Sequence, residues 1–404
     1  MSQSQQTRWT IVLLAVLAGM AAGMQVGKVP PAIPNLEVDL GITRLTAGWI
    51  ASIFNAMGAL AGVAAGMVAD RLGHRRVLLI GLACLGAGSA LGAAAPDGAV
   101  LLASRFLEGV GFVTIVVAAP ALIVAAATVR DQRLVLGIWS LYMPAGMTVM
   151  MLATPTLIQA LGWRGLWAVN ASLVIAIAVV LGATTRGLGA PPAVTRHWAE
   201  VARALAAPGP WLLGLMFTTY TIQWFGVLSW LPTYLIETGG VAAASAALIT
   251  AGAVACNMAG NLTGTWLAHR GVDRSRTLMV VCLCLAVLSL GVYIDGPPPA
   301  LKPIFAAAFS LIGGVLPAAV FSGVGRHSGS AGDIGTVSGV VVQFSNLGAV
   351  AGPPLIAAAV GWFGGWSDAG WVLFAAGMAG VAVAFALGRV ERRLDRASPA
   401  RSRP

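Results

Sequence analysis

The sequence predicts an all-α membrane protein with twelve transmembrane helices in two pseudo-symmetric six-helix bundles. Of its 404 residues, 58% are hydrophobic and only 9% are charged, whereas a soluble globular chain carries about 25% charged residues. Apolar runs recur along the whole chain, and each is long enough for a bilayer crossing, which takes about 20 residues. Because so few polar residues are left over, the composition excludes a sizeable soluble domain.

The predicted spans follow one another with short loops between them. The first run is interpreted as a span and not as a signal peptide, because further apolar runs follow at once and no small-residue cleavage site precedes a polar chain. The twelve predicted spans are residues 9–29, 46–68, 76–95, 98–127, 134–158, 164–184, 209–232, 243–268, 275–294, 300–323, 334–361 and 368–388.

The formal net charge of +10 comes from arginines that gather in alternate loops and at the two ends of the chain. The opposite side of the predicted topology has little basic charge beyond Lys28, Arg44, Arg164 and Lys302. Since basic loops stay in the cytoplasm, we expect a multi-pass protein of the bacterial inner membrane with both termini cytoplasmic. The charge then reflects topology and contact with membrane lipids, and no nucleic-acid partner is expected.

The chain divides near its middle, where a segment rich in proline and charge interrupts the apolar runs. Residues 1–186 are expected to form the N-terminal six-helix bundle and residues 209–388 the C-terminal one. A cytoplasmic linker at residues 187–208 joins them, and a basic cytoplasmic tail follows at residues 389–404. A monomer is expected.

The two halves repeat one another at an offset of 199 positions. Each contains Gly-Trp-X-Gly-X-Trp, at residues 162–167 and 361–366, and the same offset places Pro155 on Pro354. Parallel repeats of this kind enclose a substrate site near the bilayer midplane. The tryptophans of both copies are predicted to anchor the membrane interface, where amphipathic rings gather.

The loop between spans two and three carries an ordered set of glycines and charges, Gly-Met-Val-Ala-Asp-Arg-Leu-Gly-His-Arg-Arg at residues 66–76. It resembles the signature loop of the major facilitator superfamily, Gly-X-Leu-Ala-Asp-Arg-X-Gly-Arg-Arg/Lys. The resemblance implies that Asp70, Arg71 and Arg75 form a gate that stabilises the closed cytoplasmic side. The alternative is a plain basic turn, because a cytoplasmic loop would be positive in any case.

Span four contains Arg105-Phe-Leu-Glu108-Gly109-Val-Gly111, which resembles a second motif of the same family, Arg-X-X-Gln/Glu-Gly-X-Gly. Residues three apart share one face of a helix, so Arg105 and Glu108 are expected to lie together. Ionisable residues inside a membrane are costly unless they are paired, and they mark functional sites. A purely structural ion pair is the alternative.

The family resemblance covers nearly the whole chain and implies a secondary transporter that works by alternating access. The antiporter signature of the family's exporters, Gly-X-X-X-Gly-Pro-X-X-Gly-Gly, is missing from span five. Short phrases are similar to the cyanate/nitroimidazole branch of small organic-anion porters, namely GKVPPAIP at residues 27–34, YTIQW at 220–224 and SWLPTYL at 229–235. We therefore expect symport of a small organic anion with protons, and the alternative is a proton-driven exporter of drug-like or hydrophobic compounds.

A channel and a lipid-modifying membrane enzyme are disfavoured, because a channel needs no gated repeat and no catalytic cluster is visible. The four cysteines all fall inside apolar runs without metal-ligand spacing. No enzymatic activity, cofactor or metal is expected.

The candidate site residues are the ionisable and polar side chains inside the spans. Glu108 is the candidate for proton coupling, since an anion that binds Arg105 would release this carboxylate to take a proton. Lys28 either lines the cavity or extends to the outer interface, because a straight helix from Trp9 places it near the outer boundary. The predicted substrate-binding residues are Lys28, Arg105, Gln25, Asn55, Tyr142, Gln223, Trp224, Gln343 and Asn346.

Overall fold

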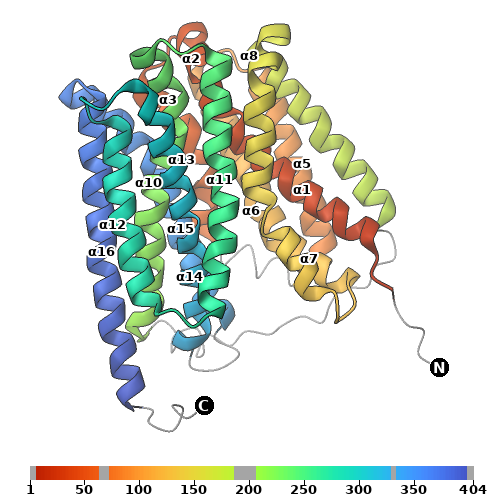
Figure 1. Cartoon of the computed structure of the whole chain (residues 1–404). Coiled ribbons are helices and arrows are strands. Elements are labelled where there is room, and N and C mark those ends of the chain that lie inside the picture. Colours follow the sequence, from red (N-terminus) through yellow and green to blue (C-terminus); the bar gives the residue numbers. More distant parts are fainter. Residues whose placement is uncertain (1–5, 63–71, 186–205, 329–333, 398–404) are drawn as a thin grey trace. The chain divides into compact units, whose positions relative to one another are not determined.

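The computed structural model describes residues 6–62, 72–185, 206–328 and 334–397, and every regular element among them is a helix (Figure 1). The elements are α1 (Trp9–Gly27), α2 (Val29–Leu40), α3 (Arg44–Ser52), η1 (Ile53–Asn55), α5 (His74–Ala93), α6 (Gly98–Ala126), α7 (Gln132–Trp139), α8 (Tyr142–Thr184), α10 (Pro208–Gly239), α11 (Ala243–His269), α12 (Arg274–Tyr293), η2 (Pro299–Leu301), α13 (Lys302–Gly313), α14 (Val315–Val324), η3 (Gly325–His327), α15 (Ile334–Phe363) and α16 (Trp366–Ala397).

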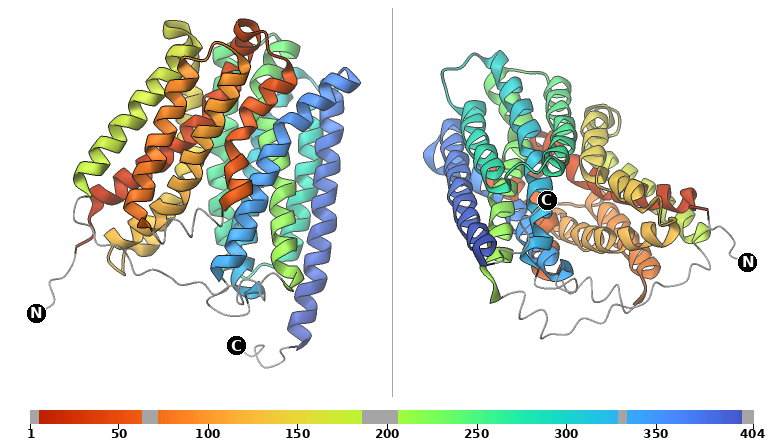
Figure 2. Two further views of the ribbon diagram at one scale, coloured as in Figure 1. Left: turned by 180° about the vertical axis from the view of Figure 1, so that it is seen from behind. Right: turned by 60° about the horizontal axis from the view of Figure 1, so that its bottom comes forward.

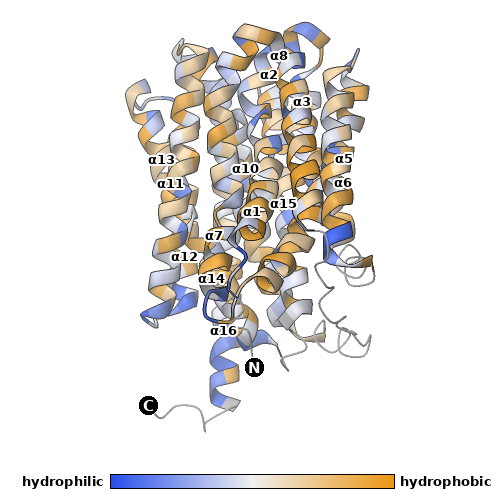
Figure 3. Ribbon diagram, turned by 90° about the vertical axis from the view of Figure 1, so that its right-hand side faces the viewer, coloured by the Kyte–Doolittle hydropathy of each residue, from blue (hydrophilic) through white to orange (hydrophobic). Residues whose placement is uncertain are grey.

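Eleven stretches of the described chain are long and apolar enough to cross a membrane, and their apolar lengths are visible in Figure 3. One of them, Leu134–Thr184, has 51 residues, which at 1.5 Å per residue would be about 77 Å long. That is more than twice the hydrocarbon thickness of about 30 Å. Its helix α8 is broken at Gly162, which has φ of 69°, and Figures 1 and 2 show that the chain of α8 turns back on itself. This stretch therefore supplies two crossings, and the predicted all-helical membrane fold is confirmed.

The chain separates into two compact units, which are described one at a time. Unit 1 comprises Met1–Thr195 with Leu228–Ala255, and unit 2 comprises Arg196–Val227 with Cys256–Pro404. Helices α10 and α11 each contribute to both units. The division into bundles at residues 1–186 and 209–388 stays a prediction.

In unit 2, α12 packs against α16 and α13. One end of this group carries a polar network, in which Glu391 of α16 pairs with Arg274 of α12 and its Oε1 lies 3.2 Å from Nε2 of His327. The last turns of α16 are hydrophilic (Figure 3). The helix continues to Ala397, so part of the predicted basic tail is a continuation of the last span.

The first span, Trp9–Gly27, agrees with the predicted residues 9–29, but the helical run continues beyond it. Helix α1 passes directly into α2 at Lys28, whose backbone N–H donates to the carbonyl of Met24 over 3.0 Å. Pro30 and Pro31 lie in the first turn of α2, where a proline is tolerated because the N–H that it lacks has no partner within the helix. Lys28 therefore follows the first span directly and lies within a helical run, not at its outer end.

The prediction that the repeated tryptophans anchor the interface is wrong for three of the four. Trp163 and Trp167 are only 2% and 0% exposed, and Trp366 is 9% exposed. Trp163 donates from Nε1 to Oδ2 of Asp39 over 2.9 Å. Only Trp362, which is 81% exposed, has the accessible ring that an anchor needs.

Four helices form the centre of unit 1, with α1 and α5 each packed against both α6 and α8. Small residues bring the backbones close, as is usual in membranes. A Cβ at Gly88 of α5 would lie 2.7 Å from Cγ of Glu108, and a Cβ at Gly109 of α6 would collide with the carbonyl oxygen of Phe54 and lie 2.9 Å from its carbonyl carbon. Gly109 therefore lets α6 press against the turn η1.

Substituting Gly109 by alanine is expected to destabilise the protein, because the added methyl group must displace the backbone of Phe54. Overpacking of this kind costs about 1–3 kcal/mol. The matched control is Gly137→Ala in α7, where the new Cβ has nothing within 4 Å and helix propensity improves. Thermal unfolding of the detergent-solubilised protein measures both variants. Equal melting temperatures for the two would contradict the packing argument.

Candidate functional site

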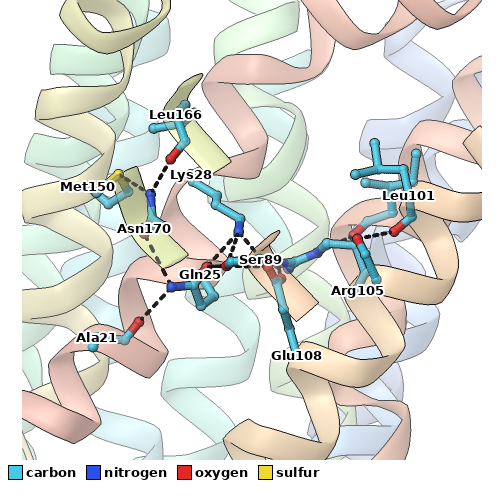
Figure 4. Close-up of polar contacts among 12 residues, drawn as sticks. Ala21, Gln25, Lys28, Ser89, Leu101, Arg105, Glu108, Met150, Leu166 and Asn170 are labelled. Carbon is cyan, nitrogen blue, oxygen red and sulfur yellow. Dashed lines mark hydrogen bonds and ion pairs between the residues drawn. The ribbon is translucent and has the colours of Figure 1, made fainter. Parts of the chain in front are cut away.

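Three buried ionisable side chains meet at the centre of unit 1, and we call them the Lys28–Arg105–Glu108 triad (Figure 4). The ammonium Nζ of Lys28 lies 2.6 Å from Oε1 of Glu108. The other carboxylate oxygen, Oε2, pairs with Nη1 of Arg105. All three side chains are 0% exposed. The single carboxylate is therefore shared between two cations.

The triad and the neighbouring Ser89 come from α6, from α5 and from the junction of α1 with α2. Helix α6 carries both Arg105 and Glu108, one turn apart on one face, as the sequence predicts. Lys28 comes from the junction of α1 and α2, and Ser89 comes from α5. The hydroxyl of Ser89 lies 2.6 Å from Oε1 of Glu108 and 3.1 Å from Nζ of Lys28. Ser89 thus bridges the cation and the carboxylate.

Two polar side chains orient Lys28 from the other direction. Oε1 of Gln25 accepts from Nζ of Lys28 over 2.6 Å, and Nε2 of Gln25 donates to Oδ1 of Asn170 over 3.2 Å. Asn170 of α8 in turn donates to the carbonyl of Leu166 over 2.9 Å. Because its amide nitrogen is held by Asn170, Gln25 presents its carbonyl oxygen to Lys28.

Aromatic rings cover the two cations. Nζ of Lys28 lies 4.4 Å from the centre of the Trp167 ring, and the guanidinium carbon of Arg105 lies 4.8 Å from the centre of the Phe54 ring. Ring faces attract cations within about 6 Å. These contacts stabilise positive charge without supplying a negative one.

Arg105 is not fully satisfied by its partners. Its Nε donates to the carbonyl of Ile50 over 3.1 Å, and its Nη1 binds Glu108. Its Nη2 is buried and has no hydrogen-bond partner within the described residues. A guanidinium presents five donors in a fixed fork that matches carboxylates, so Nη2 offers a donor to an incoming anion.

Asn55 and Tyr142 of unit 1 do not join the triad by any hydrogen bond among the described residues, and the candidates of unit 2 are described by themselves. In unit 1, Asn55 donates to the carbonyl of Ser52 over 3.4 Å and Tyr142 stacks on Trp139. In unit 2, Asn346 donates to the carbonyl of Val342 over 2.9 Å, and Gln343 is half-buried.

Two further candidates of unit 2 are neighbours in α10. Gln223 and Trp224 are buried. Gln223 donates from Nε2 to the carbonyl of Thr219 over 3.1 Å. Oε1 of Gln223 and Nε1 of Trp224 have no partner among the described residues.

Two of the three predicted gate residues, Asp70 and Arg71, lie outside the described residues. Arg75 is described, and it donates to Oγ1 of Thr185 over 2.9 Å and to the carbonyl of Gly182 over 2.8 Å. It therefore binds the end of α8, where a cation is favoured by the helix dipole.

Sequence reasoning missed Ser89, Asn170, Trp167 and Phe54. Asn170 is a polar residue inside an apolar run, which is a visible signal, and Trp167 belongs to the repeated motif. Ser89 and Phe54 carry no distinguishing signal, because serine and phenylalanine are common in membrane helices. In the described part of the chain, no group of three or more His, Cys, Asp or Glu residues is arranged to hold a metal ion.

Comparisons with known proteins agree with the helical architecture. A family model described as Major Facilitator Superfamily matches residues 11–353. A solved bacterial homologue of the human lysosomal transporter Spinster, in an inward-facing and unoccupied conformation, has a TM-score of 0.80 over 98% of each chain. Its sequence identity is 15%, so this likeness concerns the fold.

Curated relatives include transport proteins and a resistance protein. The chain is 30% identical over 177 residues to the puromycin resistance protein pur8 of Streptomyces alboniger, covering 43% of this chain and 35% of that protein. It is 27% identical to the galactose-proton symporter of Escherichia coli strain K12, covering 43% and 37%. It is also 27% identical to the cyanate transport protein CynX of the same strain, covering 59% and 62%. The first two matches span little more than a third of those relatives.

Proposed function

This chain belongs to the major facilitator superfamily of membrane transporters, and we propose that its substrate is a small organic anion carried together with protons. We place it in the bacterial inner membrane with both termini cytoplasmic, acting as a monomer by alternating access. Asp70, Arg71 and Arg75 are proposed to gate the cytoplasmic side.

The observation that carries the anion proposal is the charge of the triad. Two basic side chains face a single carboxylate in a site that is 0% exposed, so the site needs one further negative charge to be neutral when all three groups are ionised. Unpaired charge inside a membrane protein is costly, and it marks a substrate or ion pathway. The unpartnered Nη2 of Arg105 supplies the donor. A bound anion would supply that negative charge and satisfy this donor at once.

Glu108 is proposed as the proton-coupling residue, because it competes with the substrate anion for Arg105. The same carboxylate also binds Lys28. The net charge of the site therefore depends on the substrate, on Glu108 and on both basic side chains together. A change in one member must then be compensated by another, and a proton is the compensating charge available in water.

The relatives support transport of a small solute, but their names fit two different functions. The cyanate transport protein and the galactose-proton symporter carry small solutes by name. The puromycin resistance protein favours a second candidate, the proton-driven export of drug-like compounds. The triad has two basic side chains and one carboxylate, a composition that opposes a cationic drug, and for this reason we prefer the anion.

Counterflow in proteoliposomes tests the proposal, because only a carrier exchanges solute through alternating states. Vesicles loaded with unlabelled pyruvate, lactate or benzoate are expected to accumulate the matching labelled acid transiently, above the level in protein-free vesicles. Ethidium and galactose serve as cationic and neutral controls. Exchange of either control without exchange of any of the three acids would contradict an anion carrier.

A further inference from the structure

We propose that Lys28 holds the coupled proton, being a neutral amine while the anion site is empty and an ammonium when the anion is bound. The inference rests on the proposed anion transport and names where its proton resides. In the step, the amine lone pair of Lys28 takes a proton from a hydronium ion: one N–H bond forms, one O–H bond of the hydronium breaks, and a neutral water molecule is left. One proton and one anion are taken up together, so charge balances.

The position of Lys28 makes this exchange local. Its Nζ lies within 3.1 Å of three oxygens, those of Gln25, Ser89 and Glu108. An ammonium has three N–H donors for them, whereas a neutral amine has two. The described charges that act on Lys28 are the Glu108 carboxylate and the Arg105 guanidinium, both from α6. The side chains that face it from α1, α5 and α8 are Gln25, Ser89 and Trp167, which are uncharged.

Glu108 is the less suitable place for the proton. Both of its carboxylate oxygens are engaged, Oε1 by Lys28 and Ser89 and Oε2 by Arg105. Three donors that converge on a carboxylate favour its ionised form. Arg105 does not give up its proton in proteins. Of the three members, Lys28 is thus the one whose proton can leave while an intact ion pair stays behind.

The net charge of the site favours Lys28 over Glu108 as the residue that holds the coupled proton. If Lys28 is the carrier, the empty site holds Arg105 and Glu108 and is neutral, and the loaded site gains one proton and one anion and is neutral again. If Glu108 is the carrier, the site has one uncompensated positive charge in both states. Burying an uncompensated charge is strongly unfavourable, so the neutral cycle is favoured. Glu108 still couples the proton to the anion. Because its negative charge already neutralises Arg105, the site can bind a second negative charge only when Lys28 is protonated.

Binding to the purified protein in detergent tests the assignment, with pyruvate, lactate and benzoate as probes. Calorimetry in two buffers of different ionisation enthalpy counts the protons taken up. Wild type is expected to take up close to one proton per anion. In the pH range where Lys28 is neutral before binding, raising the pH by one unit is expected to lower the affinity for the acid by up to about tenfold. Lys28→Arg carries a permanent charge, and it is expected to bind the same acid with no proton uptake and less than about a twofold change across that range.

A second measurement covers the case in which Lys28→Arg does not fold. The chain has only two lysines, Lys28 and Lys302, so a protein labelled with nitrogen-15 at lysine Nζ gives two signals. Lys302→Arg removes one of them and identifies the other. The Lys28 signal is expected to move from amine to ammonium when the acid is added.

The outcomes separate the two proposals. If wild type binds none of the three acids, the proposed anion substrate fails. If wild type binds an acid but Lys28→Arg retains full proton uptake, or if the Lys28 signal is that of an ammonium before and after binding, anion transport stands and Lys28 is not the carrier.

Discussion

Replacing Arg105 by lysine is expected to weaken anion binding by about tenfold or more, and replacing it by alanine by about a hundredfold. A hydrogen bond to a charged group is worth about 1.5–3 kcal/mol, and tenfold in affinity corresponds to about 1.4 kcal/mol. Lysine retains the charge but loses the fork that lets one nitrogen bind Glu108 while Nη2 faces the anion. Titration of the purified variants with pyruvate, lactate and benzoate measures the loss.

The matched control for Arg105→Lys is Arg164→Lys. Arg164 also lies over an aromatic ring and donates to a backbone carbonyl, that of Ala95, over 3.1 Å, but it contacts none of the triad residues in the described chain. Its substitution should leave the affinity within about twofold of wild type. Wild-type affinity in Arg105→Ala would place the anion site elsewhere.

Glu108→Gln is expected to lower the free energy of unfolding strongly, because Arg105 loses the one carboxylate that it binds. Removing one partner of a buried ion pair costs about 3–5 kcal/mol. The double variant Arg105→Gln/Glu108→Gln leaves no arginine to be stranded, so its loss should be clearly smaller than the sum of the two single losses. Unfolding of the three variants in detergent gives this double-mutant cycle.

Non-additivity separates a buried pair from two residues that merely fill space. If the losses in the two single variants add up to the loss in the double variant, Arg105 and Glu108 are not energetically coupled, and the triad assignment is contradicted. Ser89→Ala is a useful companion. It removes the contacts of the Ser89 hydroxyl with Glu108, Lys28 and Gln25 but leaves both ion pairs intact, so it should be the mildest of these changes.

The pairing of Arg105 with Glu108 could be predicted from the sequence, because a spacing of three in one helix places two side chains on the same face. The pairing of Lys28 with Glu108 could not. These residues are 80 positions apart, and their contact depends on how α1 packs against α6. The two prolines after Lys28 also suggest a helix end, whereas the helical run continues to Leu40.

The tryptophans show a second limit of sequence analysis. A tryptophan near the end of an apolar run suits an interface anchor and a buried ring equally well. Helix α8 is broken at Gly162, and the apolar side chains of the following turn are buried, so that Trp167 lies over Lys28. Which side of the helix faces the bundle is set by packing between helices, and no local pattern of residues specifies it.

Accumulation of pyruvate, lactate or benzoate against its gradient, driven by an imposed pH gradient in proteoliposomes, tests most directly that proton and anion move together through the triad. Wild type should accumulate at least one of these acids above the level in protein-free vesicles and lose the accumulation when the pH gradient is collapsed. Glu108→Gln should still exchange the acid across the membrane but should not accumulate it. Accumulation by Glu108→Gln with the pH dependence of wild type would contradict the coupling of proton and anion at this site.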